Sequence, residues 1–557
     1  MRRRWLIGVA LLVLSTGGPG LAADPGPLPL RWVFVYRNLQ EDRHVAEIRA
    51  IAETAARHGL NGLVLSAGLD RLTSQGQAYR DRLRAVKQLC DELGLELVPM
   101  MFSIGYGGGA ADRRQWAEGL PVRNAPFRVA GAEARLVPDP RIAIRNGGLE
   151  EHDGRRVRHF AFHDRPGEIS FVDTAIRHEG TSALRFENFA ADPHGHGRLM
   201  QEIAVTPERC YRVSLWVRTE NLEPAGAFLV QVLDRDGRIL AATKPRLGPT
   251  SDWTEVTVGF NSFGNDRLRL YVGVWGGRGG KFWVDGLRLE ETALLNVLRR
   301  PSTPVRVRSE DSGLEYEEGR DFLPIADPGF NFRFDREPPP IRLAPGTRIQ
   351  DGERLRVDFY HPLALYAGQV TLCMSEPDLY ETWRQQAVAL AELIGPRRHV
   401  LLSMDEIRAG GTDAACRRRG LSMGEILGDA ITRLFHIVRA SNPQARVWTW
   451  SDMLDPHQNA RGGYYLVEGS FTGSWLHVPR ELGIVAWHTP TRRESLAHFS
   501  RLGFRTLAGA YYDGDTLANP MQWLEALRDT PGAEGIMYTT WRNKYELLAA
   551  FGDLVSR

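Results

Sequence analysis

Cysteine and net charge are both scarce in this sequence, and each shortage excludes a class of protein. Only four cysteines occur in 557 residues, Cys90, Cys210, Cys373 and Cys416, and none forms a C-x-x-C pattern. Their spacing indicates neither a disulfide framework nor a zinc site, so we expect buried thiols, with room for one disulfide. The formal net charge of +2 shows no excess of basic residues that would point to a nucleic-acid partner.

The N-terminal apolar run is too short to cross a bilayer comfortably. The segment MRRRWLIGVALLVLSTGGPGLAADPGP begins with three arginines, continues with apolar residues from Trp5 to Leu14, and ends in small residues around Ala22 and Ala23. This pattern predicts a secretory signal peptide over residues 1–23 rather than a membrane anchor. We therefore expect a secreted or periplasmic protein with no integral membrane span after cleavage.

A glycine-rich phosphate loop is also missing after the first strand-like segment, which argues against an open doubly wound sheet. Strand-like apolar runs alternate with helical periodicity at both ends of the chain, three before residue 122 and five after residue 363. The eight predicted strands are 31–36, 62–66, 95–109, 399–406, 445–453, 483–488, 504–513 and 535–541. Eight such units predict an α/β fold, a (β/α)8 TIM barrel.

The middle of the chain interrupts this barrel. Helical periodicity gives way to short alternating segments bounded by Gly, Pro, Asn and Asp, as in a sandwich. We predict an inserted β-sandwich, a jelly roll, over 123–298 and a small β-rich module over 299–362. The barrel would then consist of an N-terminal segment, 24–122, which supplies strands 1–3, and a C-terminal segment, 363–557, which supplies strands 4–8.

Two adjacent carboxylates, Asp405 and Glu406, end the fourth predicted strand. Side chains alternate along a strand, so one of the two must lie where the strand breaks; Glu406 could swing over the mouth of the barrel while Asp405 lies on its floor. The usual glycosidase carboxylates come from different strands. An adjacent pair suits substrate assistance, in which a 2-acetamido oxygen attacks, Glu406 protonates the leaving oxygen and Asp405 orients the acetamido group.

The barrel segments resemble glycoside hydrolase family 20, the retaining β-N-acetylhexosaminidases, in which an Asp-Glu pair ends the fourth strand. The resemblance implies that Arg37 binds sugar hydroxyls and that Tyr511 and Asp513 hold the acetamido oxygen and a hydroxyl. It also implies that tryptophans line the sugar site. The tryptophans at matching strand ends are Trp450, Trp487 and Trp541. The Trp-x-Glu of the family is replaced by Trp541-Arg542-Asn543, which places Asn543 where a glutamate would contact hydroxyls.

The inserted sandwich resembles the jelly-roll carbohydrate-binding modules found beside glycan hydrolases, through "FVDTAIRHEGTSALRFEN" and "FWVDGLRLEE". The resemblance implies a structural calcium site in which Glu150 and Asp285 could be ligands. A plain sandwich without metal or sugar is the equal alternative. We expect no cofactor for catalysis.

The prediction is a secreted glycoside hydrolase that cleaves β-linked N-acetylhexosamine residues of an oligo- or polysaccharide by the substrate-assisted route. One alternative is a non-catalytic glycan-binding protein. The other is a glycosidase that acts on a non-acetamido glycan with a separate carboxylate nucleophile, Asp452 or Asp513.

Overall fold

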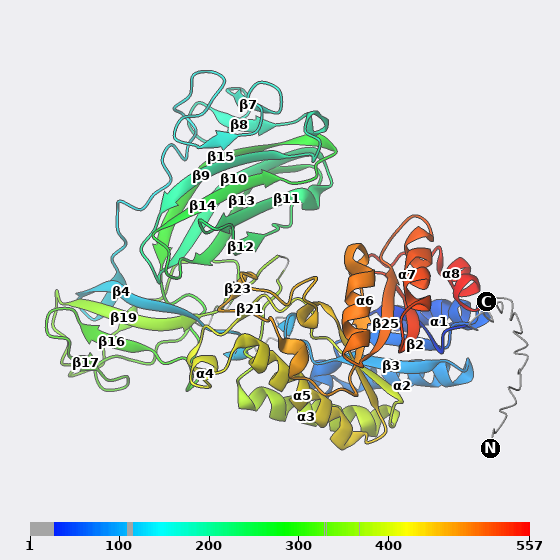
Figure 1. The fold of residues 1–557 in the computed structure, drawn as a ribbon. Coiled ribbons are helices and arrows are strands. Elements are labelled where there is room, and N and C mark those ends of the chain that lie inside the picture. The colour runs from blue at the N-terminus through cyan, green and yellow to red at the C-terminus, as the bar shows by residue number, and fades with distance from the viewer. Residues whose placement is uncertain (1–26, 108–114, 328, 330, 367) are drawn as a thin grey trace, which may run out of the picture.

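A closed barrel of eight parallel strands forms one end of the molecule (Figure 1). The computed structural model describes residues 27–107, 115–327, 329, 331–366 and 368–557. The barrel strands follow one another in chain order: β1 (Leu30–Tyr36), β2 (Gly62–Ser66), β3 (Glu96–Met101), β20 (His399–Leu402), β22 (Arg446–Trp450), β24 (Gly483–Ala486), β25 (Arg505–Tyr511) and β26 (Ala533–Thr539). The parallel barrel and its interruption by antiparallel sheets agree with the sequence prediction.

Helices connect most of these strands. They are α1 (Asp42–Arg57), α2 (Gln77–Glu92), α3 (Pro377–Ile394), α4 (Ala414–Arg417), α5 (Met423–Ser441), α6 (Arg492–Arg501), α7 (Ala518–Arg528) and α8 (Leu548–Val555). Strict alternation fails between β22 and β24, where residues 451–482, all described, contain only 3-10 turns and β23 (Leu466–Val467). The sequence pattern predicts helical segments between the last strands. In residues 451–482, however, Gly, Asn, Asp and Pro together are frequent, and these residues favour turns.

Because side chains alternate along each strand, the barrel has two apolar cores, one inside the barrel and one between the strands and the surrounding helices. Trp32 and Phe34 of β1 point into the barrel interior, while Val33 and Val35 pack outward against the helices. Trp448 and Trp450, both from β22 on the opposite side of the barrel, belong to the same interior cluster, and the ring centroids of Phe34 and Trp450 lie 6.2 Å apart. The barrel is therefore filled with side chains, and its upper aromatic layer can serve as the floor of a site.

Two five-stranded antiparallel sheets form the inserted sandwich, with strand orders β13-β10-β15-β8-β7 and β12-β11-β14-β9-β6. The strands of the first sheet are β7 (Ser170–Asp173), β8 (Ala183–Phe186), β10 (Cys210–Glu223), β13 (Ser251–Asn261) and β15 (Gly279–Thr292). Those of the second are β6 (Phe162–His163), β9 (Gly197–Ala204), β11 (Phe228–Leu233), β12 (Ile239–Thr243) and β14 (Arg267–Val274). Inward-facing apolar residues of both sheets belong to one core.

A third antiparallel sheet, ordered β17-β16-β19-β4-β5-β18, differs from the predicted module boundaries. Its members are β4 (Leu120–Ala130), β5 (Glu133–Leu136), β16 (Arg306–Ser309), β17 (Glu315–Tyr316), β18 (Ile341–Arg342) and β19 (Arg354–His361). The structure thus pairs residues 120–136 with the small module, whereas the sequence analysis assigned residues from 123 onward to the sandwich. Alternating polarity predicts a strand but not its partner, which here lies more than 200 residues away.

The signal peptide predicted over residues 1–23 lies outside the described residues. Among the residues that are described, none of the helices is both long enough and apolar enough to span a membrane. A small two-stranded sheet of β21 (Ala409–Gly410) and β23 lies beside the barrel, below the sandwich (Figure 1).

Candidate active site

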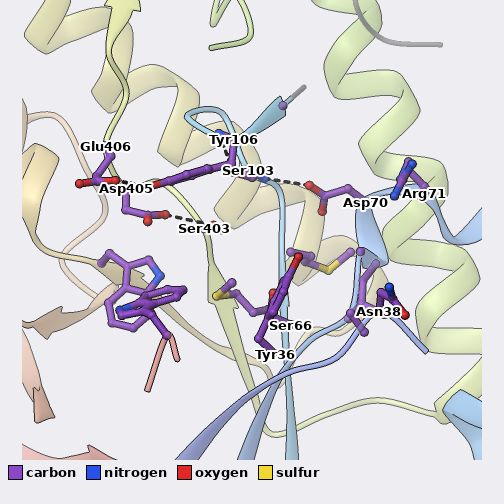
Figure 2. A pocket seen from close by; sticks show the side chains of 18 of the residues that line it. Tyr36, Asn38, Ser66, Asp70, Arg71, Ser103, Tyr106, Ser403, Asp405 and Glu406 are labelled. Atoms are coloured by element: carbon purple, nitrogen blue, oxygen red, sulfur yellow. Dashed lines mark hydrogen bonds between the residues drawn. The ribbon is translucent and has the colours of Figure 1, made fainter. Parts of the chain in front are cut away.

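A pocket of about 920 Å³ opens where the barrel strands end, and residues at or after the ends of all eight strands line it (Figure 2). This volume lies within the range typical of small-molecule sites. The lining residues include Tyr36, Asn38, Ser66, Asp70, Ser103, Tyr106, Ser403, Asp405, Glu406, Trp450, Trp487, Tyr512 and Trp541. Aromatic and polar side chains therefore share one hollow at the carboxyl ends of the strands, where barrel enzymes place their sites.

The structure brings Asp405 and Glu406 into this pocket at different depths. Strand β20 ends at Leu402, and Glu406 has a φ of 49°, in the left-handed region, so the break expected between the two carboxylates lies at Glu406. Asp405 is 8% exposed and accepts a hydrogen bond from Ser403 Oγ at 3.0 Å. Burial, reinforced by the charge of Glu406, raises the pKa of Asp405 to about 6.

Gly105 allows the segment after β3 to approach this loop. A Cβ atom at Gly105 would lie 2.2 Å from the carbonyl oxygen of Asp405, closer than any side chain tolerates. The close approach lets the next residue, Tyr106, donate its hydroxyl hydrogen to Glu406 Oε2. Glycine is therefore required here by the backbone contact that places Tyr106 against Glu406.

Glu406 has a buried cationic partner. Arg408 Nη2 lies 2.8 Å from Glu406 Oε1, and the guanidinium is held between the rings of Tyr366 and Tyr465, at 4.8 and 5.0 Å from their centroids. It also donates to Gln369 Oε1. Burial alone would lower the pKa of Arg408, but the charge of Glu406 and the neighbouring tyrosines together outweigh burial and raise it. The ion pair is thus held rigidly at the pocket mouth.

Asp452 lies behind the carboxylate pair, and it does not line this pocket. Its Oδ2 accepts hydrogen bonds from the backbone N–H of Glu406 at 2.8 Å and from Asn459 Nδ2 at 2.9 Å. Trp487 Nε1 lies 3.5 Å from its Oδ1. Full burial, with the charge of Asp405 adding to it, raises the pKa of Asp452 to about 8. Asp452 therefore positions Glu406 and Trp487, and it is placed poorly for a nucleophile.

Six aromatic side chains line the pocket, and four of them lie at the ends of the last four barrel strands. The rings of Trp487 and Tyr512 are parallel within 2°, with centroids 5.6 Å apart. Trp541 is 43% exposed and packs against Phe34 and the buried Trp450, at 4.9 and 6.1 Å. Exposed aromatic faces beside hydrogen-bonding groups suit the apolar faces and hydroxyls of a sugar ring. Three predicted tryptophans thus share the pocket with the predicted carboxylates.

Four other predicted binding residues do not line the pocket. Arg37 Nε pairs with Glu47 of α1 at 2.6 Å, and Arg37 also donates to Asn543 Oδ1. Tyr511 is buried and stacks on Tyr538 at 4.1 Å. Arg37 and Asn543 therefore join α1 to the loop after β26. The guanidinium of Arg37 is bound to Glu47 and Asn543 and not directed into the pocket.

The fourth, Asp513, positions the loop after β26. Its carboxylate accepts hydrogen bonds from Thr540 Oγ1 at 2.5 Å, from the backbone N–H of Trp541 at 3.0 Å and from that of Arg542 at 3.2 Å. Residues 511–513 have φ angles of 76°, 53° and 60°, three left-handed residues in succession. This run ends the strand alternation, so Tyr512 reaches the pocket while Tyr511 turns into the core.

In the sandwich, Glu150 and Asp285 both hold the loop 178–182. Glu150 accepts from the backbone N–H of Thr181 at 2.9 Å, and Asp285 accepts from those of His178 and Glu179 at 2.8 and 3.1 Å. Donors of the chain thus occupy oxygens that the calcium prediction assigned to an ion. Calcium binding stays a prediction.

Sequence reasoning missed three residues that shape the site. Tyr106 and Arg408 contact Glu406, and Asp70 accepts hydrogen bonds from the backbone N–H groups of Phe102 and Ser103, the latter at 2.9 Å. The sequence does show a predicted strand end near each of these three residues. The periodicity of apolar residues, however, does not specify which side chain of a loop points into the pocket.

Comparisons with known proteins give loose likenesses only. No protein-family model matches the chain, and no curated protein matches it. The carbohydrate-binding module TmCBM61, solved with β-1,4-galactotriose, is 20% identical over 27% of this chain and 97% of that chain, with a TM-score of 0.21. A structure described as "CBM4 structure and function" is 16% identical over 27% of this chain and 99% of its own, with a TM-score of 0.20.

A rhamnosidase from Novosphingobium sp. PP1Y is 12% identical and covers 92% of this chain but 55% of its own, with a TM-score of 0.31. The neighbours thus include carbohydrate-binding modules and a glycosidase. At these scores and identities the likenesses carry no argument about activity, and they do not identify family 20. The case for a function therefore rests on the site.

Proposed function

We propose that this chain is an exported glycoside hydrolase that binds a glycan in the barrel pocket. The observation that carries the proposal is the pair of pocket carboxylates, Asp405 buried and Glu406 at the mouth, beside exposed tryptophan and tyrosine rings. Glycoside hydrolysis uses carboxyl groups close to the scissile bond, and aromatic faces hold the sugar. A binding pocket for an apolar ligand would not need a buried carboxyl such as Asp405, whose pKa is raised towards neutrality.

The finer proposal is cleavage of a 2-acetamido sugar with assistance from the substrate. The aromatic rings of Trp450, Trp487 and Tyr512 support it, because they line the same pocket as Asp405. An ionised Asp405 would orient the acetamido nitrogen while the acetamido oxygen attacks the anomeric carbon. Since the pKa of Asp405 is about 6, this role requires a pH above that value.

In this scheme Glu406 donates a proton to the leaving oxygen and then takes one from water. A proton on Glu406 would remove the negative charge that pairs with Arg408, so the donor form requires the ion pair to loosen when the glycan enters. The neighbouring Tyr106 hydroxyl can then remain hydrogen-bonded to either form.

A non-catalytic glycan-binding protein is the second candidate, and the same ion pair favours it. With Arg408 and Tyr106 both bound to Glu406, the carboxylate already has its partners and could serve only to shape the pocket. The two candidates differ in turnover, so one assay separates them.

The experiment is hydrolysis by the purified full chain of aryl β-N-acetylglucosaminide, β-N-acetylgalactosaminide, β-glucoside and α-rhamnoside. Asp405→Asn and Glu406→Gln are the test variants, and Asp81→Asn, an exposed carboxylate on α2, is the matched control. Turnover of acetamido sugars only, lost in both test variants and kept in the control, supports substrate assistance. Turnover of the plain glucoside or rhamnoside would refute it. Glycan binding without any turnover would favour the second candidate.

A further inference from the structure

Four potential metal ligands from three separate segments of the chain meet where the barrel adjoins the six-stranded sheet. They are Glu118, just before β4, Cys373, just before α3, and Asp413 and Cys416 at the start of α4. All four side chains are buried, and one ligand atom from each lies within 4.8 Å of the others. None of them contributes to the pocket described above.

The separation of the two sulfur atoms fits a shared metal ion. Cys373 Sγ and Cys416 Sγ are 3.6 Å apart. Tetrahedral zinc with Zn–S bonds of about 2.3 Å places two thiolate sulfurs roughly 3.8 Å apart, whereas a disulfide bond is about 2.05 Å long. Glu118 Oε2 lies 3.8 Å from Cys416 Sγ, which is also near the edge length of such a tetrahedron.

The two carboxylates are already oriented by hydrogen bonds on their outer sides. Glu118 Oε1 accepts from Thr412 N at 2.7 Å, Thr412 Oγ1 at 2.9 Å and Asp413 N at 3.2 Å, which leaves Oε2 turned towards the sulfurs. Asp413 Oδ1 caps α4, and its Oδ2 pairs with Arg300 at 2.5 Å. Such outer partners are what fixes the carboxylates and histidines of known metal sites.

The residues around the cluster carry an excess of negative charge. Arg300 also pairs with Glu376 at 2.8 Å, so within this group of residues three carboxylates, those of Glu118, Asp413 and Glu376, face one guanidinium. Burying uncompensated carboxylates is strongly unfavourable. Zinc would attract these oxygens, but the two thiols lose their protons on binding it, so the two charges of the ion are balanced by the two thiolates.

We propose that Cys373, Cys416, Glu118 and Asp413 bind one zinc ion as a structural site. Thiolate ligands select zinc over calcium or magnesium, and four protein ligands complete its tetrahedral shell without leaving a position for substrate. The ion would join the segment that enters β4, the segment that enters α3, and α4. The site would therefore fasten the six-stranded sheet to the barrel.

The test is to purify the full chain without a metal-affinity tag and to measure its metal content by inductively coupled plasma mass spectrometry. We expect about one zinc per chain, lost in Cys373→Ser and Cys416→Ser and retained in Cys90→Ser, a matched control with another buried free cysteine. Glu118→Gln, which keeps the side-chain volume, should lower zinc occupancy and the melting temperature.

Cobalt substitution keeps the proposal testable if the cysteine variants do not fold. The wild-type chain, stripped with a chelator and loaded with Co²⁺, should show the charge-transfer absorption of thiolate-bound tetrahedral cobalt, and chelation should lower its melting temperature. A metal-free chain that takes up neither ion would overturn the proposal. So would zinc retained by both cysteine variants, or a Cys373–Cys416 disulfide found by peptide mass spectrometry of the unreduced protein.

Discussion

Replacing Asp405 by Asn should change how the stability of the barrel depends on pH. The carboxyl has a folded-state pKa of about 6 against an ordinary value near 4. The folded chain therefore keeps a proton that the unfolded chain releases, so stability is highest below pH 4 and falls as the pH rises to 6. The loss amounts to at most ~3 kcal/mol, from 1.36 kcal/mol per pKa unit. Asn does not titrate, and its Oδ1 can still accept from Ser403.

The assay is thermal unfolding of both proteins at several values of pH from 4 to 8. The melting temperature of Asp405→Asn should rise relative to wild type by on the order of 5 °C between pH 4 and pH 7. The difference should grow further towards pH 8, because the substitution also removes the charge that raises the pKa of Asp452. Asp266→Asn, an exposed carboxylate in the sandwich with a side chain 70% exposed, should show no such trend. A difference between Asp405→Asn and wild type that does not change with pH would refute the electrostatic argument.

Three further substitutions test the pocket. Asp513→Asn weakens the hydrogen bonds to the backbone of the loop after β26, so it should lower kcat/KM about tenfold and alter the tryptophan fluorescence. A raised KM with an unchanged fluorescence spectrum would instead indicate that Asp513 contacts the sugar directly. Arg408→Gln should move the basic limb of the pH–rate profile to higher pH, because a carboxyl that loses a neighbouring cation keeps its proton longer; an unmoved limb would exclude Glu406 as the acid. Tyr512→Ala should raise KM about tenfold while Tyr511→Phe changes it less than twofold, and the reverse order would contradict the register seen here.

The barrel could be predicted from the sequence because its signals are local. Apolar runs at strand length, separated by amphipathic helices, specify parallel strands whatever their partners are. The carboxylate pair could be found for the same reason, since Asp405 and Glu406 closely follow such a run. The tryptophans Trp450, Trp487 and Trp541 were located at strand ends by counting along each strand.

The remaining features depend on contacts between distant segments or on backbone angles that polarity does not encode. Strand β4 looks like a sandwich strand but pairs with β19. Tyr512 lines the pocket in place of the predicted Tyr511, because residues 511–513 are three successive residues in the left-handed region. Cys373 and Cys416 do not have the sequence spacing of a metal-site motif. Only folding brings their sulfur atoms to 3.6 Å from each other, so the sequence could not predict the cluster.

The sandwich reaches the loop that carries Glu406 through the two tyrosines that enclose Arg408. The backbone N–H of Tyr366 donates to the carbonyl of Ala242 in β12 at 2.7 Å, and Arg238, just before β12, donates to the carbonyl of Tyr465. Figure 1 shows the sandwich standing over β21 and β23, where these contacts lie. A module that only gathers glycan could be detached from a barrel without affecting small substrates.

Here the sandwich forms hydrogen bonds with the backbone of both tyrosines whose rings contact Arg408, and Arg408 in turn pairs with Glu406. Arg238→Ala should therefore impair turnover of a small aryl glycoside, by several-fold in kcat, although the substitution lies outside the pocket. Arg235→Ala, which removes an exposed ion pair of the same loop with Asp266, is the matched control and should leave kcat unchanged. Equal rates for both variants would show that the sandwich and the Glu406 loop act independently.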